Sequence, residues 1–225
     1  MKSSLSVVMI GATGAVGSRV VANLLEFGNL ERFTLLGRKG LDGVSGGGLS
    51  QHLVDLFEPS SYRHLLAGHQ VAVCTLGVGQ PSKVSREEFV RLDKSVVLDF
   101  AAECKKAGVQ HFVLLSSVDS DSRSKSFYLR VKGELEDGLA ALGFARLSVF
   151  HPSMILTPAN RYGLLQGLML QVWPSLKYVL LGPLRKYRGI EVDTLGRSMA
   201  INAASQGVGR EDFQWDEIVA LQHFS

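Results

Sequence analysis

Hydrophobic residues along this chain occur in short runs that alternate with longer amphipathic segments. A repeated strand–helix–strand order of this kind predicts a parallel sheet with helices on both faces, which is a Rossmann-type, doubly wound α/β fold. The runs of strand length are Leu5–Ile10, Phe33–Leu36, His52–Leu56, Gln70–Leu76, His111–Leu115 and Ala145–Phe150. The helical segments are Ala15–Phe27, a short helix near Pro59–Leu66, Ser85–Ala107 and Ser126–Leu142.

The pattern changes after Pro152, where the alternation weakens. An extended piece, Ile190–Val192, and a helical segment, Thr194–Ala204, follow. We expect residues 1–225 to form one dinucleotide-binding domain, in which 152–225 build a small C-terminal substrate lobe. Such a lobe would lie over the carboxyl edge of the sheet, where substrates of this fold usually bind.

A glycine-rich loop separates the first expected strand from the first expected helix. The spacing Gly-x-x-Gly-x-x-Gly in this context predicts a dinucleotide phosphate site, because free N–H groups at the helix start attract phosphate. Glycine is needed for the tight turn, for close approach of the diphosphate, and for helix–strand packing. The expected phosphate contacts are Gly11, Thr13, Gly14, Ala15, Val16 and Gly17.

The end of the second expected strand indicates which nicotinamide nucleotide binds. Sites that prefer NAD place an acid there, whereas this chain has Arg38 and Lys39. A guanidinium can hold a 2′-phosphate through two parallel hydrogen bonds, so the pair favours NADP(H). The alternative is an ordinary exposed basic loop. Other expected cofactor contacts are Asp55, Leu76 and Gly77.

Of the five tyrosines, only Tyr128 has a lysine four residues later, Lys132. On a helix this spacing brings both side chains to one face, where the ammonium favours phenolate and makes the tyrosine a usable acid or base. Lys132 can also reach the ribose of the cofactor. Ser116 and Ser117 end the fifth expected strand, where a hydroxyl can hold a substrate carbonyl. A solvated helix pair is the alternative for Tyr128 and Lys132.

Composition limits the other classes of function. The formal net charge is +3, and no dense basic stripe with interleaved aromatics occurs, so we expect no nucleic-acid partner. The two cysteines, Cys74 and Cys104, lack the spacing of a zinc site, and we expect no metal. Leu164–Leu181 is apolar but contains two glutamines, a proline and a lysine, which makes it a poor membrane span. We therefore expect a cytoplasmic protein without a transmembrane segment, with peripheral association with an organelle membrane as an alternative.

Several stretches resemble the atypical short-chain dehydrogenases/reductases, and most closely the Tat-interacting-protein (oxidoreductase) subgroup, which also has fungal mitochondrial members. These stretches are GATGAVG, LLGRK, EEFVRLDKSVVLDFAAECKKAGVQHFVLLSS and FYLRVKGELE, and the similarity is good from Val7 to Leu156.

The resemblance implies roles for individual residues. Tyr128 would be the acid/base with Lys132 as its partner, and Ser117 or its neighbour Ser116 would orient the carbonyl. Asp93 stands where most short-chain enzymes have asparagine, and an ionised carboxylate cannot donate a hydrogen bond as an amide does. His151 stands where relatives often have arginine, at the nicotinamide end, although a packing role is the alternative for it.

Our leading hypothesis is an NADPH-dependent oxidoreductase that reduces a carbonyl on a small molecule. Two alternatives remain open. One is an NADP(H)-binding regulatory protein that senses cofactor state and binds protein partners without turnover. The other is an epimerase or dehydratase that keeps its cofactor bound. The fold alone does not choose among them.

Overall fold

The computed structural model describes residues 4–79, 83–157 and 180–223. Its central feature is a seven-stranded parallel sheet with the order β3-β2-β1-β4-β5-β6-β9. Because strand order reverses between β1 and β4, a crevice opens at their carboxyl ends. The predicted Rossmann-type fold is confirmed. The strands are β1 (Leu5–Ile10), β2 (Leu30–Gly37), β3 (Leu49–Leu53), β4 (Val71–Cys74), β5 (His111–Leu115), β6 (Arg146–Phe150) and β9 (Gly209–Phe213).

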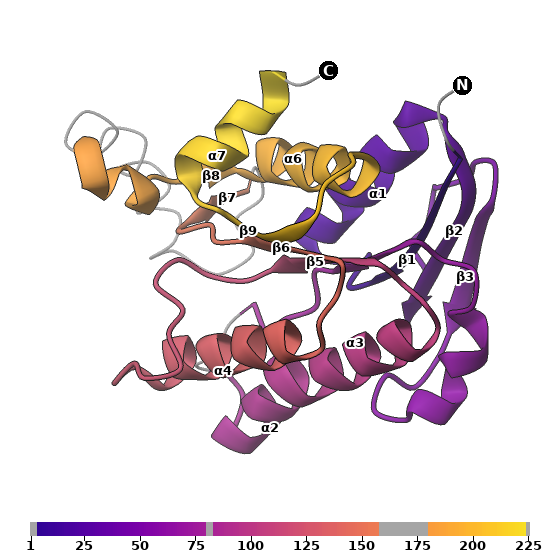
Figure 1. Cartoon of the computed structure of the whole chain (residues 1–225), viewed down its shortest axis with the longest axis horizontal. Coiled ribbons are helices and arrows are strands. Elements are labelled where there is room, and N and C mark those ends of the chain that lie inside the picture. The colour runs from indigo at the N-terminus through magenta and orange to yellow at the C-terminus, as the bar shows by residue number, and fades with distance from the viewer. Residues whose placement is uncertain (1–3, 80–82, 158–179, 224–225) are drawn as a thin grey trace.

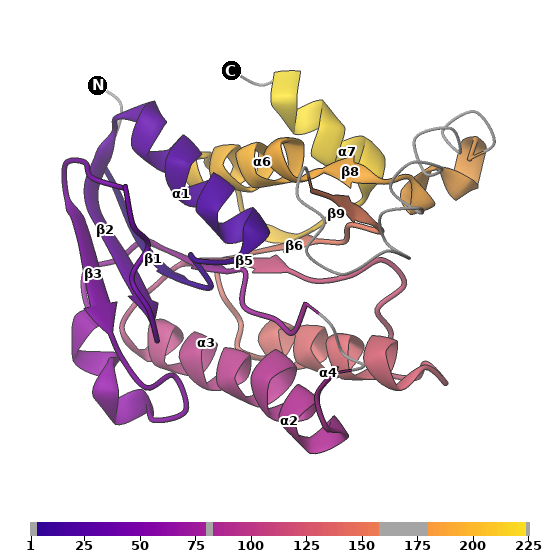
Figure 2. The ribbon, with the colours of Figure 1, turned by 180° about the vertical axis from the view of Figure 1, so that it is seen from behind.

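Helices cover both faces of this sheet. The helices α1 (Ala15–Phe27), α6 (Val192–Ala204) and α7 (Trp215–Ala220) lie on one face, and α2 (Arg86–Val90), α3 (Val96–Lys106) and α4 (Phe127–Ala141) on the other (Figures 1 and 2). The central strand β1 is therefore buried along its whole length. Val7 and Met9 pack in the hydrophobic cluster with α1 and α6, whereas Val8 and Ile10 pack in the cluster with α3 and α4.

The third strand differs from its prediction. It spans Leu49–Leu53, not His52–Leu56, and it lies at the edge of the sheet. Three of its residues are half-buried and two are exposed, so this edge position accepts the polar residues Ser50, Gln51 and His52. Val54 and Leu56, which the prediction included, lie after the strand. The short helix predicted near Pro59–Leu66 consists of two 3₁₀ turns, Pro59–Ser61 and Arg63–Leu65.

The segment predicted as one helix from Ser85 to Ala107 contains a π-helical turn. Arg91–Ser95 connects α2 to α3 in this conformation, which is rare and frequently marks functional sites. The periodicity placed Leu92 on the buried face. In the structure Leu92 is half-buried, and the fully buried residue is its neighbour Asp93.

The C-terminal part contributes to the sheet itself. Its strand β9 pairs with β6, and α6 packs so closely on α1 that a methyl group on Gly196 would lie 2.3 Å from Arg19 Cβ. The sequence did not predict β9, because three of its five residues are charged. A second small sheet joins β7 (Ile155–Leu156) to β8 (Ile190–Glu191), and a 3₁₀ helix spans Gly182–Tyr187.

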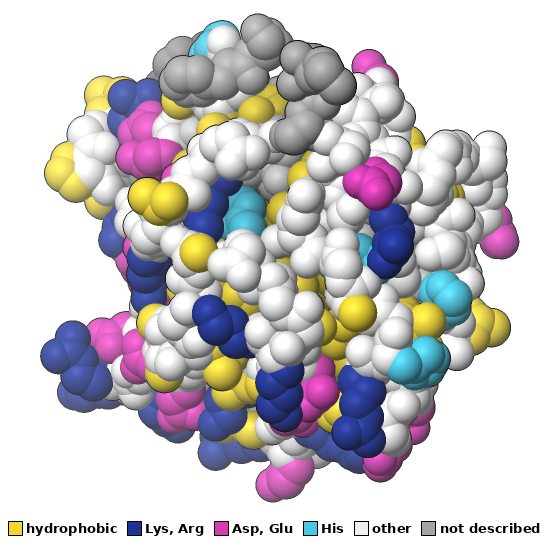
Figure 3. All heavy atoms as spheres, turned by 45° about the vertical axis from the view of Figure 1, so that its right-hand side comes forward, with side chains coloured by type: hydrophobic (Ala, Val, Ile, Leu, Met, Phe, Trp, Pro, Cys, Tyr) yellow, Lys and Arg dark blue, Asp and Glu magenta, His cyan; other side chains and the backbone are white. Residues whose placement is uncertain are grey.

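Most of the apolar stretch Leu164–Leu181 lies outside the described residues. Among the residues that are described, no helix is long and apolar enough to cross a bilayer. On the face drawn in Figure 3, basic side chains are interspersed with acidic ones.

Candidate functional site

The loop between β1 and α1 is shaped by its glycines. Gly11 has φ of +86°, and a methyl group on it would lie 2.5 Å from Leu76 N. A methyl group on Gly17 would lie 2.1 Å from Gly11 O. Thr75 Oγ1 donates a hydrogen bond to Gly11 O at 3.0 Å and fixes the loop to the end of β4. Gly11 and Gly17 are therefore required by the packing of the chain itself.

Gly14 differs from these two glycines. It is the exposed N-cap of α1 with extended backbone, and the only atom within 4 Å of a methyl group built on it would be Gly11 O, at 3.2 Å. The space in front of it is open, at a helix N-terminus that carries partial positive charge and free N–H groups. A diphosphate fits this position, since the missing side chain leaves room for a ligand rather than for the protein.

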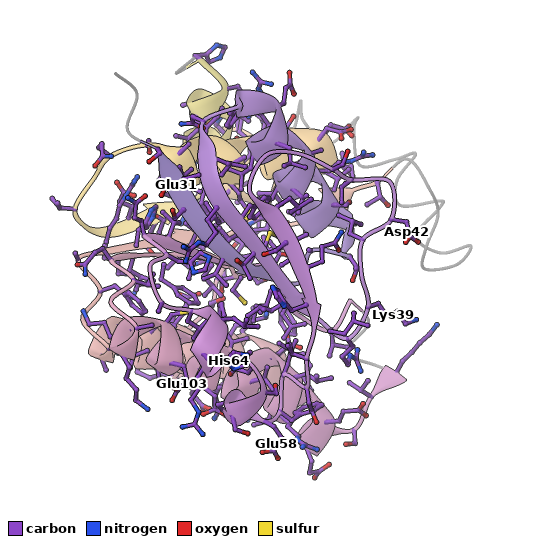
Figure 4. All side chains as sticks on the ribbon, turned by 90° about the vertical axis from the view of Figure 1, so that its right-hand side faces the viewer. Glu31, Lys39, Asp42, Glu58, His64 and Glu103 are labelled. Atoms are coloured by element: carbon purple, nitrogen blue, oxygen red, sulfur yellow. The ribbon has the colours of Figure 1, made fainter. Side chains whose placement is uncertain are left out.

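A cavity of about 460 Å³ lies on the β2 side of this loop. Arg38 and Lys39 are both exposed at its rim, and no acidic group in the described part of the chain forms an ion pair with either. Figure 4 shows Lys39 and Asp42 on the loop that follows β2. The cavity thus offers two cations that have no counter-ion among the described residues, one strand away from the phosphate loop.

Two polar residues of this cavity were missed by the sequence, namely Gln51 and His52 on β3. Gln51 holds the rim through hydrogen bonds with the backbone N and O of Leu41, at 2.8 and 3.1 Å. Asp55, which we expected to contact the cofactor, is not among the lining residues. Its carboxylate accepts a hydrogen bond from Phe57 N at 2.9 Å, in the turn after β3.

A second cavity of about 620 Å³ lies on the other side of the loop. Leu76 lines both cavities, which therefore adjoin at this residue, on the two sides of the loop at the point where strand order reverses. The second cavity brings together most of the predicted chemistry. Its lining includes Gly14, Ala15, Val16, Gly77, Asp93, Ser116, Tyr128 and Lys132, together with Ser153, Met154, Ile155 and Thr157, which the sequence did not single out.

Lys132 and Asp93 form a buried ion pair in this cavity. Lys132 Nζ lies 2.8 Å from Asp93 Oδ1, and the other carboxylate oxygen accepts from Val78 N at 2.7 Å. Burial alone would lower the pKa of Lys132, but the charge of Asp93, with smaller contributions from Tyr128 and the Asp93 hydrogen bond, raises it above its ordinary value. A methyl group on Gly77 would lie 3.1 Å from Asp93 Oδ1, so this glycine gives the pair room.

Tyr128 lies at the start of α4, which Ser126 caps by accepting a hydrogen bond from Leu129 N. Its ring packs against Phe89 of α2, with 5.5 Å between ring centroids. Tyr128 and Lys132 line the same cavity, as their spacing on a helix predicts.

The two serines after β5 have different surroundings. Ser116 is buried, lines the second cavity, and donates a hydrogen bond to Glu136 Oε1 at 2.5 Å. Ser117 does not line the cavity, and its hydroxyl has one long contact, 3.5 Å, with Val118 O. Of the two, Ser116 is therefore the one placed to contact a ligand.

His151 lies outside the cavity lining, although we expected it to contact the cofactor. It is buried, and its Nε2 lies 3.0 Å from Glu136 Oε1. Glu136, His151 and Asp212 hold their ligating atoms within 4.8 Å of one another. The guanidinium of Arg210 binds both carboxylates of this cluster, at 3.0 and 2.9 Å, and supplies the positive charge there.

Comparisons with known proteins agree with this geometry. Residues 11–146 match the family described as NAD(P)H-binding, and the chain belongs to this family. It is 37% identical over 153 residues to Protein HTATIP2 of Rattus norvegicus, an alignment that covers 67% of this chain and 63% of the rat protein. It is 26% identical over 217 residues, 92% of each chain, to the mitochondrial Protein FMP52-1 of Scheffersomyces stipitis. The resemblance inferred from the sequence is confirmed.

Solved structures confirm the fold. MoeE5 in complex with UDP-glucuronic acid and NAD superposes with a TM-score of 0.71 at 18% identity, covering 98% of this chain and 82% of that one. An NAD(P)H-binding role is established by the family. NADP(H) in particular fits the two cations, Arg38 and Lys39, that line the first cavity.

Proposed function

We propose that this protein is an NADPH-dependent oxidoreductase that reduces a carbonyl on a small molecule. The observation that carries the proposal is the pair of adjoining cavities on the two sides of the phosphate loop. Arg38 and Lys39 line the first, Tyr128 and Lys132 line the second, and Leu76 lines both. A dinucleotide held at the loop would place its 2′-phosphate at the cations and its nicotinamide near the tyrosine.

In this proposal the residues of the second cavity have separate tasks. NADPH, when bound, supplies the hydride to the carbonyl carbon. Tyr128 donates its hydroxyl proton to the carbonyl oxygen as the new C–H bond forms. The ammonium of Lys132 stabilises the resulting phenolate and holds the ribose, while Asp93 keeps that ammonium in place.

The experiment measures NADPH oxidation with a panel of small aldehydes and ketones, together with NADPH and NADH affinities by calorimetry. Tyr128→Phe should abolish turnover and leave NADPH affinity within about twofold, a change worth under 1 kcal/mol. Arg38→Ala should weaken NADPH by about tenfold or more and leave NADH nearly unchanged. Equal losses for both nucleotides would contradict the 2′-phosphate contact.

A regulatory role without turnover is the second candidate, and the Lys132–Asp93 pair favours it. A carboxylate at 2.8 Å neutralises much of the positive charge that would otherwise stabilise a Tyr128 phenolate. This candidate expects tight NADPH binding with no oxidation of NADPH by any carbonyl. An epimerase-type role remains the third candidate, and it expects the nucleotide to stay bound through purification.

We propose a cytoplasmic protein, whereas the fungal relatives carry the word mitochondrial in their names. Fluorescent tagging at the C-terminus, with organelle markers, distinguishes the two locations.

A further inference from the structure

Glu136 of α4 forms hydrogen bonds with Ser116, which lines the second cavity, and with residues on or directly after two further strands, β6 and β9. Its carboxylate accepts hydrogen bonds from Ser116 Oγ after β5, from His151 Nε2 after β6, and from Arg210 Nη2 on β9, at 2.5, 3.0 and 3.0 Å. Glu136 is only 4% exposed. One buried carboxylate thus joins three neighbouring strands to the helix that carries Tyr128 and Lys132.

This arrangement determines the direction of the Ser116 hydroxyl. An ionised carboxylate beside a guanidinium only accepts hydrogen bonds, and a serine hydroxyl has one proton to donate. The Ser116 proton is therefore directed at Glu136. The hydroxyl of the neighbouring Ser120 lies 3.2 Å from Ser116 Oγ, but it donates its own proton to Ser117 O at 2.7 Å and so offers Ser116 none. Ser116 lines the second cavity, so with its proton engaged the hydroxyl can offer a ligand there only an oxygen lone pair.

We propose that Glu136 is a positioning residue that makes Ser116 a hydrogen-bond acceptor, so that the site selects ligands with a donor hydroxyl beside the reacting carbonyl. The inference rests on the proposed function, in which Tyr128 donates to the carbonyl oxygen. Ser116 then accepts from the adjacent hydroxyl, and the substrates are hydroxycarbonyl compounds. A ligand with a second carbonyl in place of that hydroxyl would bring its carbonyl oxygen against Ser116 Oγ. Both atoms are hydrogen-bond acceptors, so such a ligand would bind less tightly.

Glu136→Gln is the variant that tests this direction. Arg210 can only donate, so it will hold the amide oxygen, and the amide NH₂ will then face Ser116 and His151. Ser116 then loses its carboxylate acceptor and keeps only the neutral Ser120 hydroxyl, at 3.2 Å, so its proton becomes available to a ligand in the cavity. The substitution should therefore convert Ser116 from an acceptor into a donor toward the ligand.

The probes are acetoin, which has a hydroxyl beside its carbonyl, and diacetyl, which has a second carbonyl in that place. The quantity compared is the ratio of kcat/KM for acetoin to kcat/KM for diacetyl, because intrinsic reactivity cancels when this ratio is compared between variants. We expect Glu136→Gln to lower the ratio by about tenfold or more. In a Ser116→Ala background, the same substitution should leave the ratio unchanged, which a general loss of packing would not do.

Affinity provides a measurement that does not need turnover. Dissociation constants of both probes for the protein loaded with NADP⁺, from ligand-observed NMR titration, should shift in the same direction on Glu136→Gln. If affinities shift without any turnover, the oxidoreductase proposal fails and this one stands. An unchanged ratio, or a wild-type protein that binds neither probe, overturns it. Should Glu136→Gln not fold, Ser116→Ala alone must still lose the preference for acetoin.

Discussion

Lys132 Nζ and Asp93 Oδ1 lie 2.8 Å apart, with side chains only 6% and 1% exposed. This pair joins α4 to the π-helical turn before α3 and lies in the wall of the second cavity. Its position explains how a carboxylate is tolerated where the resembling enzymes most often have asparagine. The carboxylate of Asp93 is engaged within the protein, because it pairs with the ammonium of Lys132 and accepts a hydrogen bond from Val78 N.

Asp93→Asn should destabilise the protein by about 3 kcal/mol, because it leaves a buried ammonium without its counter-ion. The raised pKa of Lys132 means that the pair contributes stability throughout the range below the ordinary lysine value of about 10.5, and that this contribution disappears as pH rises through the folded pKa. Urea denaturation at pH 7 measures the loss. Asp137→Asn, at an exposed position of α4, is the matched control and should change stability by less than about 0.5 kcal/mol.

The Lys132–Asp93 pair illustrates which features of the site the sequence predicts and which it does not. The helix spacing correctly placed Tyr128 and Lys132 on one face, and three spaced glycines between strand and helix correctly located the loop. Asp93 was noticed only through resemblance. Its burial depends on a π-helical turn, and the 3.6-residue periodicity that favoured Leu92 does not reveal such a turn.

The contacts made by Glu136 and the strand β9 lay beyond sequence reasoning for a different reason. Glu136 meets Arg210 across 74 positions of sequence, and local patterns carry no information about such a pair. β9 has the sequence GREDF, which reads as an exposed turn. The charged residues of β9 fit a strand because they form ion pairs with neighbouring elements: Arg210 pairs with Glu136, and Glu211 pairs with Arg146.

Two glycines of the loop should respond differently to alanine. Gly17→Ala should cost on the order of 3 kcal/mol of stability, since its methyl group would lie 2.1 Å from Gly11 O. Gly14→Ala should cost at most about 1 kcal/mol, because its backbone is extended and its surroundings are open. It should nevertheless weaken NADPH about tenfold by occupying the diphosphate position. Thermal unfolding and calorimetry on the same samples separate the effects. A Gly14→Ala protein with unchanged NADPH affinity would contradict the assigned phosphate position.

His111 should make folding sensitive to mild acid. Burial, and then the nearby charge of Arg146, lower the pKa of His111 to about 3, so the folded protein holds it neutral beside Ser148. The unfolded chain takes up a proton near pH 6.5. Stability is therefore complete above that value and falls toward pH 3, at about 1.4 kcal/mol per pH unit for this residue.

His111→Gln should reduce that slope, since its amide can still donate to Ser148 without titrating. Urea denaturation between pH 7 and pH 5 provides the comparison. His64→Gln is the control, because His64 is exposed in a 3₁₀ turn and labelled in Figure 4. A pH dependence of stability identical in wild type and His111→Gln would show that His111 does not carry the effect.

The stability of the protein should respond differently to loss of the Tyr62 hydroxyl and to loss of the Tyr187 hydroxyl. Tyr62 is fully buried between α3 and the 3₁₀ turns, and its hydroxyl has no hydrogen-bond partner in the described part of the chain. Burial, with the nearby acids of α3, raises its pKa. Tyr62→Phe removes an unsatisfied polar atom and should leave stability unchanged or raise it by up to about 1 kcal/mol.

Tyr187 donates to Asp119 at 2.6 Å, so Tyr187→Phe should lower stability by about 0.5 to 1 kcal/mol. Equilibrium denaturation of the two variants in parallel decides the matter, because a loss in Tyr62→Phe as large as that in Tyr187→Phe would mean that the Tyr62 hydroxyl has a partner after all.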